Sequence, residues 1–289
     1  MRAWRFSKPK GPGFGISQTF YLSVLSSRPV LPSPHMVANP KGVDGAVTGF
    51  AVPLGSAKGK DALQLPMEFG GYAIASTDRK TVLAMQVMSR DTAGFDPEPF
   101  ARSLLALNFS PEVVSRVRGT WQLMQMKFES HAPEVYPSLD FLQDVCIRLA
   151  MLTEGVVADS ISARYQLPQQ VRMPVRADAR VDAREHIAVA FRDAPTGIHA
   201  YTLGLQKFAL PEFEITGLRE TDQTKATTYL HALSQTVLVT GPVKLGLAYG
   251  PFQVSEGGFD KAHWRGLPVY ELLPDRKQFA GEALESWRP

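Results

Sequence analysis

The segment from Gly197 to Gly217, GIHAYTLGLQKFALPEFEITG, constrains the fold more than any other part of this 289-residue chain. It consists of two runs rich in β-forming residues joined by a short stretch with glycine and proline, a pattern typical of two strands connected through a corner. Gly204 indicates a bulge or a close backbone approach, and Pro211 ends strand pairing because it has no amide hydrogen. We therefore predict two neighbouring strands here.

Polar residues in this segment form the strongest candidate site. Residues two apart on a strand share a face, so His199 and Tyr201 lie together, as do Glu212 and Glu214. Paired carboxylates near a histidine suit acid–base catalysis or ligand contact. Surface or strand-end carboxylates with a structural tyrosine are the more common explanation of such spacing, and both interpretations remain open. The candidate ligand or partner contacts are His199, Tyr201, Thr202, Lys207, Glu212 and Glu214.

The first 43 residues carry the excess positive charge. They contain Arg2, Arg5, Lys8, Lys10, Arg28 and Lys41 and no acidic residue. Taking these six from the 31 basic residues leaves 25 against 28 acidic ones, so the remaining chain is close to neutral. We predict a disordered basic leader over 1–43. Three interpretations of it are open: an arm that contacts anions or nucleic acid, an organelle transit sequence, or an extension translated from a start upstream of Met36.

The rest of the composition excludes several classes of protein. The single cysteine, Cys146, excludes an internal disulfide and a cysteine-built zinc site, and its place in a helical apolar stripe predicts that it is buried. No apolar run reaches the roughly 18 residues of a membrane span. The six histidines are scattered, and no glycine-rich segment has the spacing of a nucleotide-binding loop. We expect a soluble cytoplasmic protein with no cofactor, no metal and no membrane partner.

Periodicity divides the chain after the leader into a first α/β half over 44–166, a connector over 167–184 and a second α/β half over 185–289. Each half contains one long amphipathic helix, which we expect to begin at an N-cap residue, Ser138 or Thr221. Short β-type runs and hairpin turns surround both helices. Because hairpins are mixed with helices, we predict an α+β fold with largely antiparallel sheets, compatible with two similar strand–helix halves.

The chain resembles the bacterial domain-of-unknown-function family numbered 4261. Members have the pattern Thr-x-Gly-Leu-x-x-Phe-x-x-x-Glu-x-Glu after two strands, and the matching residues here are Thr202, Gly204, Leu205, Phe208, Glu212 and Glu214. The resemblance spans roughly residues 71–273. It departs from the family at Ala209 and Leu210, where a glycine is often expected, and the leader has no counterpart. The resemblance implies a fold and no defined reaction.

Three functions are compatible with this sequence. No residues have the spacing of a catalytic motif, so we expect a protein-binding accessory or immunity-like module without catalysis, whose partner is another protein. The first alternative is a small-ligand sensor or enzyme that uses Glu212 and Glu214 with His199 and Tyr201. The second is a nucleic-acid accessory protein, in which binding takes place only through residues 1–43.

Overall fold

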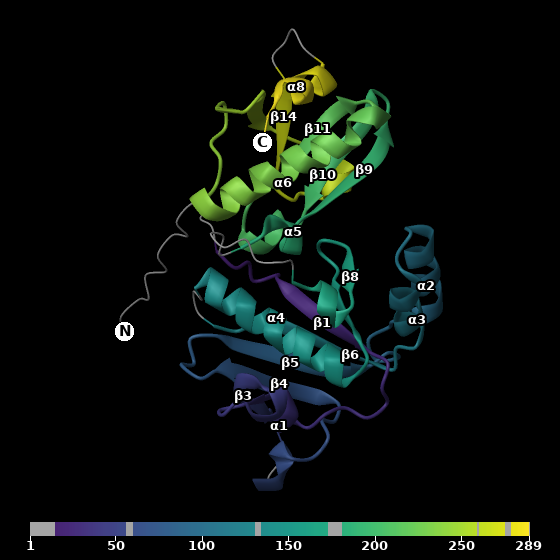
Figure 1. Ribbon diagram of the computed structural model, residues 1–289, viewed down its shortest axis with the longest axis vertical. Helices are drawn as coiled ribbons and strands as arrows, with labels where there is room; N and C mark the ends of the chain where they lie inside the picture. The colour runs from purple at the N-terminus through teal and green to yellow at the C-terminus, as the bar shows by residue number, and fades with distance from the viewer. Residues whose placement is uncertain are drawn as a thin grey trace, which may run out of the picture. The chain divides into compact units, whose positions relative to one another are not determined.

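The chain divides into two compact units, shown in a computed structural model that describes residues 15–55, 60–130, 134–172, 181–258, 260–274 and 279–288 (Figure 1). The eight-stranded unit comprises residues 18–180, and the six-stranded unit comprises residues 181–289 with the described residues before Gln18. The division after Arg180 falls within the predicted connector, 167–184. The predicted α+β fold, with largely antiparallel sheets and two main helices, is confirmed.

The eight-stranded unit has the sheet order β2-β3-β4-β5-β6-β1-β7-β8, and every neighbouring pair except β2 and β3 is antiparallel. Its strands are β1 (Tyr21–Ser26), β2 (Ala38–Asn39), β3 (Val47–Pro53), β4 (Gly70–Ser76), β5 (Val82–Ser89), β6 (Gln122–Phe128), β7 (Val156–Asp159) and β8 (Arg164–Gln166). Its helices are α1 (Pro34–Val37), α2 (Pro97–Ala106), α3 (Pro111–Arg118) and α4 (Val135–Leu152).

The long helix α4 packs on the apolar face of this sheet (Figure 1). Burial alternates along the central strands β5 and β6. Met85, Met124 and Met126 are almost completely buried, while the residues next to them on each strand are at least partly exposed. Cys146 lies within 4.0 Å of the Met126 sulfur, and its burial raises the pKa of the thiol. The prediction that Cys146 is buried is confirmed.

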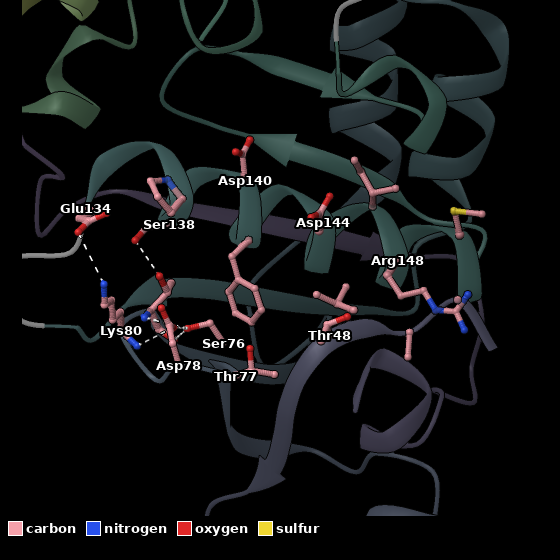
Figure 2. A pocket seen from close by; sticks show the side chains of 18 residues that line it. Thr48, Ser76, Thr77, Asp78, Lys80, Glu134, Ser138, Asp140, Asp144 and Arg148 are labelled. Carbon is pink, nitrogen blue, oxygen red and sulfur yellow. Dashed lines mark hydrogen bonds and ion pairs between the residues drawn. The ribbon is translucent and has the colours of Figure 1, made fainter. Parts of the chain in front are cut away.

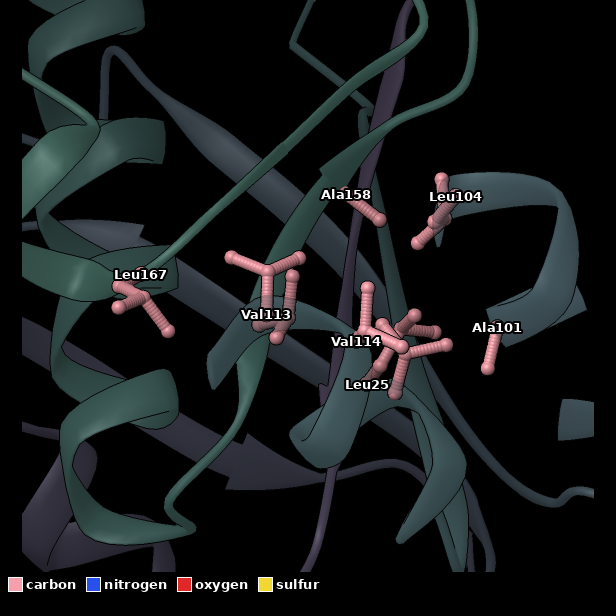
Figure 3. Packing of buried hydrophobic residues seen from close by; sticks show 9 residues of the cluster. Leu25, Ala101, Leu104, Val113, Val114, Ala158 and Leu167 are labelled. Carbon is pink, nitrogen blue, oxygen red and sulfur yellow. The ribbon is translucent and has the colours of Figure 1, made fainter. Parts of the chain in front are cut away.

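Helices α2 and α3 pack on β1 and β7 of the same sheet (Figure 3). Proline stands at the first position of each helix, and the preceding Asp96 or Ser110 accepts a hydrogen bond from a backbone amide of the first turn. The buried residues that converge here are Leu25, Ala101, Leu104, Val113, Val114, Val117, Val156, Ala158 and Leu167.

The prediction of a disordered leader is wrong for the described part of residues 1–43. β1 lies between β6 and β7 and pairs with both, and Leu22, Val24 and Leu25 are buried. An interior strand is short and apolar, so the run from Phe20 to Leu25 is long enough to form one although it is too short for a signal peptide. The basic residues at positions 2, 5, 8 and 10 lie outside the described residues.

The six-stranded unit has the sheet order β12-β13-β14-β11-β10-β9, and only β11 and β14 are a parallel pair. Its strands are β9 (Ala188–Ala194), β10 (Gly197–Leu203), β11 (Glu212–Leu218), β12 (Ala248–Tyr249), β13 (Phe252–Glu256) and β14 (Val269–Pro274). Its helices are α5 (Ala183–His186), α6 (Gln223–Thr240), α7 (Lys261–Trp264) and α8 (Ala280–Ser286). The long helix α6 packs against β9, β10 and β11.

The two faces of this second sheet have different chemistry. One face presents apolar residues such as Ala200, Phe213 and Ile215, which are almost completely buried. The strand register places His199 beside Arg192 and Glu214 beside Glu271 on the opposite face. Polar and ionisable side chains therefore lie on the inner strands, where an apolar layer is the usual arrangement.

Both predicted N-caps are displaced in the structure. α4 begins at Val135 and α6 at Gln223, so Ser138 lies inside the first turn of its helix and Thr221 lies before Asp222, the N-cap of α6. Ser138 is buried, and its hydroxyl is 2.8 Å from that of Thr81. This contact joins α4 to the start of β5.

Candidate functional site

The six residues singled out from the sequence lie on β10 and β11 or in the turn that joins these strands. All but Tyr201 are fully buried, and Tyr201 is 9% exposed. Surface carboxylates are therefore excluded as an interpretation of Glu212 and Glu214. The fully buried residues are His199, Thr202, Lys207, Glu212 and Glu214, and none of them presents a side chain to a partner in this structure.

Glu212 binds the turn that follows β10. Its Oε1 accepts hydrogen bonds from the backbone amides of Gly204 (2.8 Å) and Gln206 (3.1 Å), and its Oε2 accepts one from Thr202 Oγ1 (2.7 Å). The Thr202 hydroxyl in turn accepts a hydrogen bond from the Phe213 amide. Burial raises the pKa of Glu212, and these hydrogen bonds oppose the shift. The geometry is that of a carboxylate that fixes a turn.

Gly204 permits a close backbone approach at this turn, as the sequence predicted. Its φ of 127° lies in the region that favours glycine, and a Cβ there would lie 2.4 Å from the carbonyl oxygen of His186. The same oxygen accepts a hydrogen bond of 2.6 Å from Lys207 Nζ. Gly204 and Lys207 thus connect the turn to the end of α5.

Glu214 belongs to a second network, on the polar face of the sheet. Its Oε2 accepts a hydrogen bond from Trp264 Nε1 (2.8 Å) and lies 3.0 Å from His199 Nε2, while its Oε1 accepts one from the Gly258 amide (2.6 Å). Arg192 Nε donates to His199 Nδ1 over 2.9 Å. Because arginine only donates, Nδ1 must accept, and the ring proton therefore lies on Nε2 and points to Glu214.

Arg192 extends this network towards solvent. Its Nη1 donates to Asp260 Oδ2 over 3.0 Å, and Asp260 Oδ1 accepts from the backbone amides of Ala262 and His263. The hydrogen bond from the His263 amide, together with Arg192, lowers the pKa of Asp260. One end of α7 is thus attached to β9 through Asp260, and the other is attached to β11 through Trp264.

Aromatic rings enclose the polar network. Tyr201 lies 4.8 Å from His263 and 5.5 Å from Trp264, centroid to centroid, and the Arg192 guanidinium lies 6.0 Å from the centre of the Tyr201 ring. Burial raises the pKa of Tyr201, and the charge of Arg192 opposes that shift. Burial and Arg192 together lower the pKa of His263, which favours its neutral form.

The predicted carboxylate pair, Glu212 with Glu214, does not form, and Glu214 is instead paired with Glu271. Glu212 and Glu214 enter separate networks, whereas Glu214 and Glu271 stand opposite each other on the parallel strands β11 and β14. Burial first, and then the charge of Glu214, raise the pKa of Glu271, which accepts a hydrogen bond of 3.2 Å from Thr216 Oγ1. In the described residues no three His, Cys, Asp or Glu side chains are grouped so that they could hold a metal ion.

These contacts indicate a structural role for the predicted site. The His199 ring uses both nitrogens in protein contacts, and Glu214 accepts from two further donors, so neither group is presented to a substrate. Among the carboxylates on the described strands of this face, half-buried Glu271 retains access to solvent. The network stabilises the sheet and α7 by satisfying buried polar groups.

A separate concave site lies in the eight-stranded unit, beside α4 (Figure 2). It is an open groove of about 790 Å³ that follows the helix from Glu134 to Met151. The facing wall is formed by residues 45–48, at the start of β3, and by residues 76–81, from the end of β4 through the turn before β5. Phe141, Ile147 and Met151 supply apolar surface along the helix side.

Carboxylates lie along both walls of this groove. Asp78 stands on the turn, and its Oδ1 accepts hydrogen bonds from Ser76 Oγ (2.6 Å) and the Lys80 amide (3.0 Å). These hydrogen bonds lower the pKa of Asp78, so the group is ionised at neutral pH. Asp140 and Asp144 project from α4 one turn apart, and each gives one oxygen to Arg172, at 3.1 Å and 2.7 Å respectively.

The two basic residues of the groove are already used by the protein. Lys80 Nζ lies 3.9 Å from Glu134. Arg148 donates from Nε to the Met36 carbonyl (3.0 Å) and from Nη2 to the Asp44 carbonyl (2.7 Å), which fixes the segment before β3. The lining residues include four acidic and two basic side chains, so the groove is acidic.

Sequence reasoning did not identify this groove. Its walls come from three segments that are far apart in the chain, and only strand pairing and the packing of α4 bring them together. The one local signal was the Asp140 and Asp144 pair on the exposed side of a helix. Like charges four residues apart destabilise a helix slightly, and Arg172 offsets this repulsion in the structure.

The comparisons with known proteins add no function. No protein-family model matches the chain, and no curated protein or solved structure matches it either. Membership of the family that the sequence resembles therefore stays a prediction. None of the helices in the described ranges combines the length and apolar character that crossing a membrane requires.

Proposed function

We propose that this protein is a non-catalytic protein-binding module, in the manner of accessory or immunity proteins, and that the groove beside α4 is its docking site. The observation that supports this proposal is the groove itself, which combines apolar residues on its helix side, Phe141, Ile147 and Met151, with polar residues on both walls. Protein interfaces combine an apolar centre with a polar margin in this way. We further propose a cytoplasmic location, which the single buried cysteine, Cys146, suits.

The dimensions of the groove fit a polypeptide segment. The helix wall from Glu134 to Met151 is about 26 Å long at 1.5 Å per residue. An extended segment of about eight residues spans the same length at 3.3 Å per residue. Small-molecule sites enclose most of their ligand, whereas this groove is partly open to solvent. A segment of another protein is therefore the better-fitting occupant.

A small-ligand sensor or enzyme is the second candidate, and one observation favours it. Glu271 is half-buried beside Glu214, and burial together with the charge of Glu214 raises its pKa, as is common for groups at functional sites. The nucleic-acid alternative, in which binding takes place only through residues 1–43, gains no such support from the described part of that segment, where residues 21–26 form β1 and Arg28 is paired with Glu154.

A crosslinking experiment tests the docking site. The full chain with Met151→Cys is labelled with a benzophenone maleimide and irradiated in native lysate, with Leu107→Cys as the control. Met151 lines the groove and is 60% exposed, while Leu107 is 68% exposed and lies outside it. Cys146 stays unlabelled because it is buried and its thiol pKa is raised.

We expect one stoichiometric protein to crosslink at position 151 and not at 107. A bulky polymer maleimide at position 151 should also prevent capture of that protein, whereas the same label at 107 should not. A partner retained in spite of the label at 151 would place docking on another surface. Turnover of a small molecule by the purified chain, lost in Glu271→Gln, would support the second candidate instead.

A further inference from the structure

We infer that the segment which docks in the groove beside α4 is extended and basic, with two lysine or arginine side chains that meet Asp140 and Asp144. This inference rests on the proposed function and specifies its partner. Four carboxylates line the groove, and its two basic residues are held by Glu134 and by two backbone carbonyls. An acceptor-rich wall complements a segment rich in donors.

Asp140 and Asp144 retain capacity to bind a second cation. Each carboxylate gives its Oδ1 to Arg172, and in the described chain neither Oδ2 has a hydrogen-bond partner. Both side chains are more than half exposed, at 57% and 51%. Arg172 shows that one guanidinium can span the two carboxylates. Both aspartates also line the groove, so a basic side chain bound there is close to the same pair.

The spacing of the two aspartates sets the spacing of the cations. Residues four apart on a helix are separated by about 6 Å along its axis. Residues two apart on an extended segment are separated by about 6.6 Å and point to the same side. A segment with basic residues at positions i and i+2 therefore matches Asp140 and Asp144. Asp78, on the opposite wall, is available to a basic or amide donor on the other side of that segment.

A displayed library of random dodecapeptides provides the probe. It is selected on the full chain and counter-selected on the chain blocked by a polymer maleimide at Met151→Cys. Each selected peptide is then synthesised, and its binding to the full chain is measured together with that of a version in which Lys and Arg are replaced by Gln. The inference predicts enrichment of basic residues at i and i+2 and weaker binding as salt increases.

Charge variants decide whether the two aspartates are responsible. Asp140→Asn with Asp144→Asn should weaken a selected peptide by about fivefold or more, as the loss of two exposed ion pairs implies. Asp91→Asn with Glu112→Gln removes two exposed acids outside the groove and should leave binding unchanged. Arg172→Gln should strengthen binding, because it removes the competing cation, and a purely structural role for Arg172 does not predict this result.

The possible outcomes separate the inference from the proposed function. One outcome is a set of peptides that require the open groove, carry no basic residues and bind the aspartate variant as well as the parent. This result would overturn the inference but would still support the groove as a docking site. Failure to select any groove-dependent peptide would overturn the inference too. In that case the lysate crosslink at position 151 decides separately whether the groove docks a protein.

Discussion

The two units differ in the kinds of side chain that they bury against their sheets. The eight-stranded unit fills its core with methionine, leucine and valine, and Asp159 is its one buried acid among the described residues. The six-stranded unit buries ionisable groups beside its apolar layer, and these groups are His186, His199, Lys207, Glu212, Glu214 and Asp222. An apolar core tolerates changes of shape within its volume, whereas a buried polar network fails when one member is lost.

This contrast also separates structural charges from accessible ones. In the six-stranded unit the charges lie inside, where Glu214 and Arg192 fix a histidine and a short helix. In the eight-stranded unit the charges line the groove and retain unused acceptor positions. A charged residue is therefore better evaluated for function by its remaining hydrogen-bonding capacity than by its position on a conspicuous motif.

Removal of Glu214 should have the largest effect. Glu214→Leu leaves the Gly258 amide, Trp264 Nε1 and His199 Nε2 buried without an acceptor, which should cost at least about 3 kcal/mol of unfolding free energy at about 1–3 kcal/mol per donor. Urea unfolding, with Trp264 fluorescence to follow the six-stranded unit, measures the loss. The control in the other core, Met126→Leu, conserves volume and should cost less than about 1.5 kcal/mol. Equal losses would remove the distinction between the two cores.

The turn between β10 and β11 should be the next most sensitive feature. Gly204→Ala forces a side chain into a positive-φ conformation and against the His186 carbonyl, which should cost about 1–3 kcal/mol for the backbone strain and more for the contact. Gly246→Ala is the matched control, because Gly246 has a φ of 80° and no atom within 4 Å of the added Cβ. It should cost only about 1 kcal/mol. Thermal unfolding of both variants separates the cost of the steric contact with His186 from the cost of the positive φ alone.

The pH dependence of stability should identify Glu271 as a destabilising charge. Its folded pKa is raised above the ordinary value of 4.5, so its stabilising contribution is complete below pH 4.5 and is lost as the pH rises through the folded pKa. Glu271→Gln should therefore be more stable than the parent at pH 7 and equal to it near pH 4. Urea midpoints at both pH values test this.

Asp260 supplies a control of opposite sign. Its folded pKa is lowered below the ordinary value of 3.8, so its stabilising contribution is present above that value and is lost as the pH falls through the folded pKa. Asp260→Asn should therefore be less stable than the parent at pH 7, and the difference should shrink in acid. The same sign for both variants would contradict the assignment of Glu271.

Local pattern was enough to predict the longest elements of this fold but not the environment of its charges. The neighbouring strands β10 and β11, the two long helices and the burial of Cys146 followed from periodicity and turn residues. The burial of Glu212 and Glu214 could not be predicted in this way. Spacing of i and i+2 shows that two residues share a face of a strand but not which residues cover that face, and Trp264, which contacts Glu214, lies 50 positions further along the chain. β1 was missed because a basic composition outweighed one short apolar run.

The smallest expected effect belongs to the groove, and it carries the most information about function. Asp140→Asn with Asp144→Asn removes two exposed ion pairs with Arg172, each worth about 0–1 kcal/mol, and also removes a repulsive i, i+4 pair. The free energy of unfolding should therefore change by less than about 1 kcal/mol. A change of that size means that any loss of peptide binding in this variant reports on recognition. A loss above about 2 kcal/mol would instead make the aspartates structural, like Glu214, and the contrast between the two units would no longer hold.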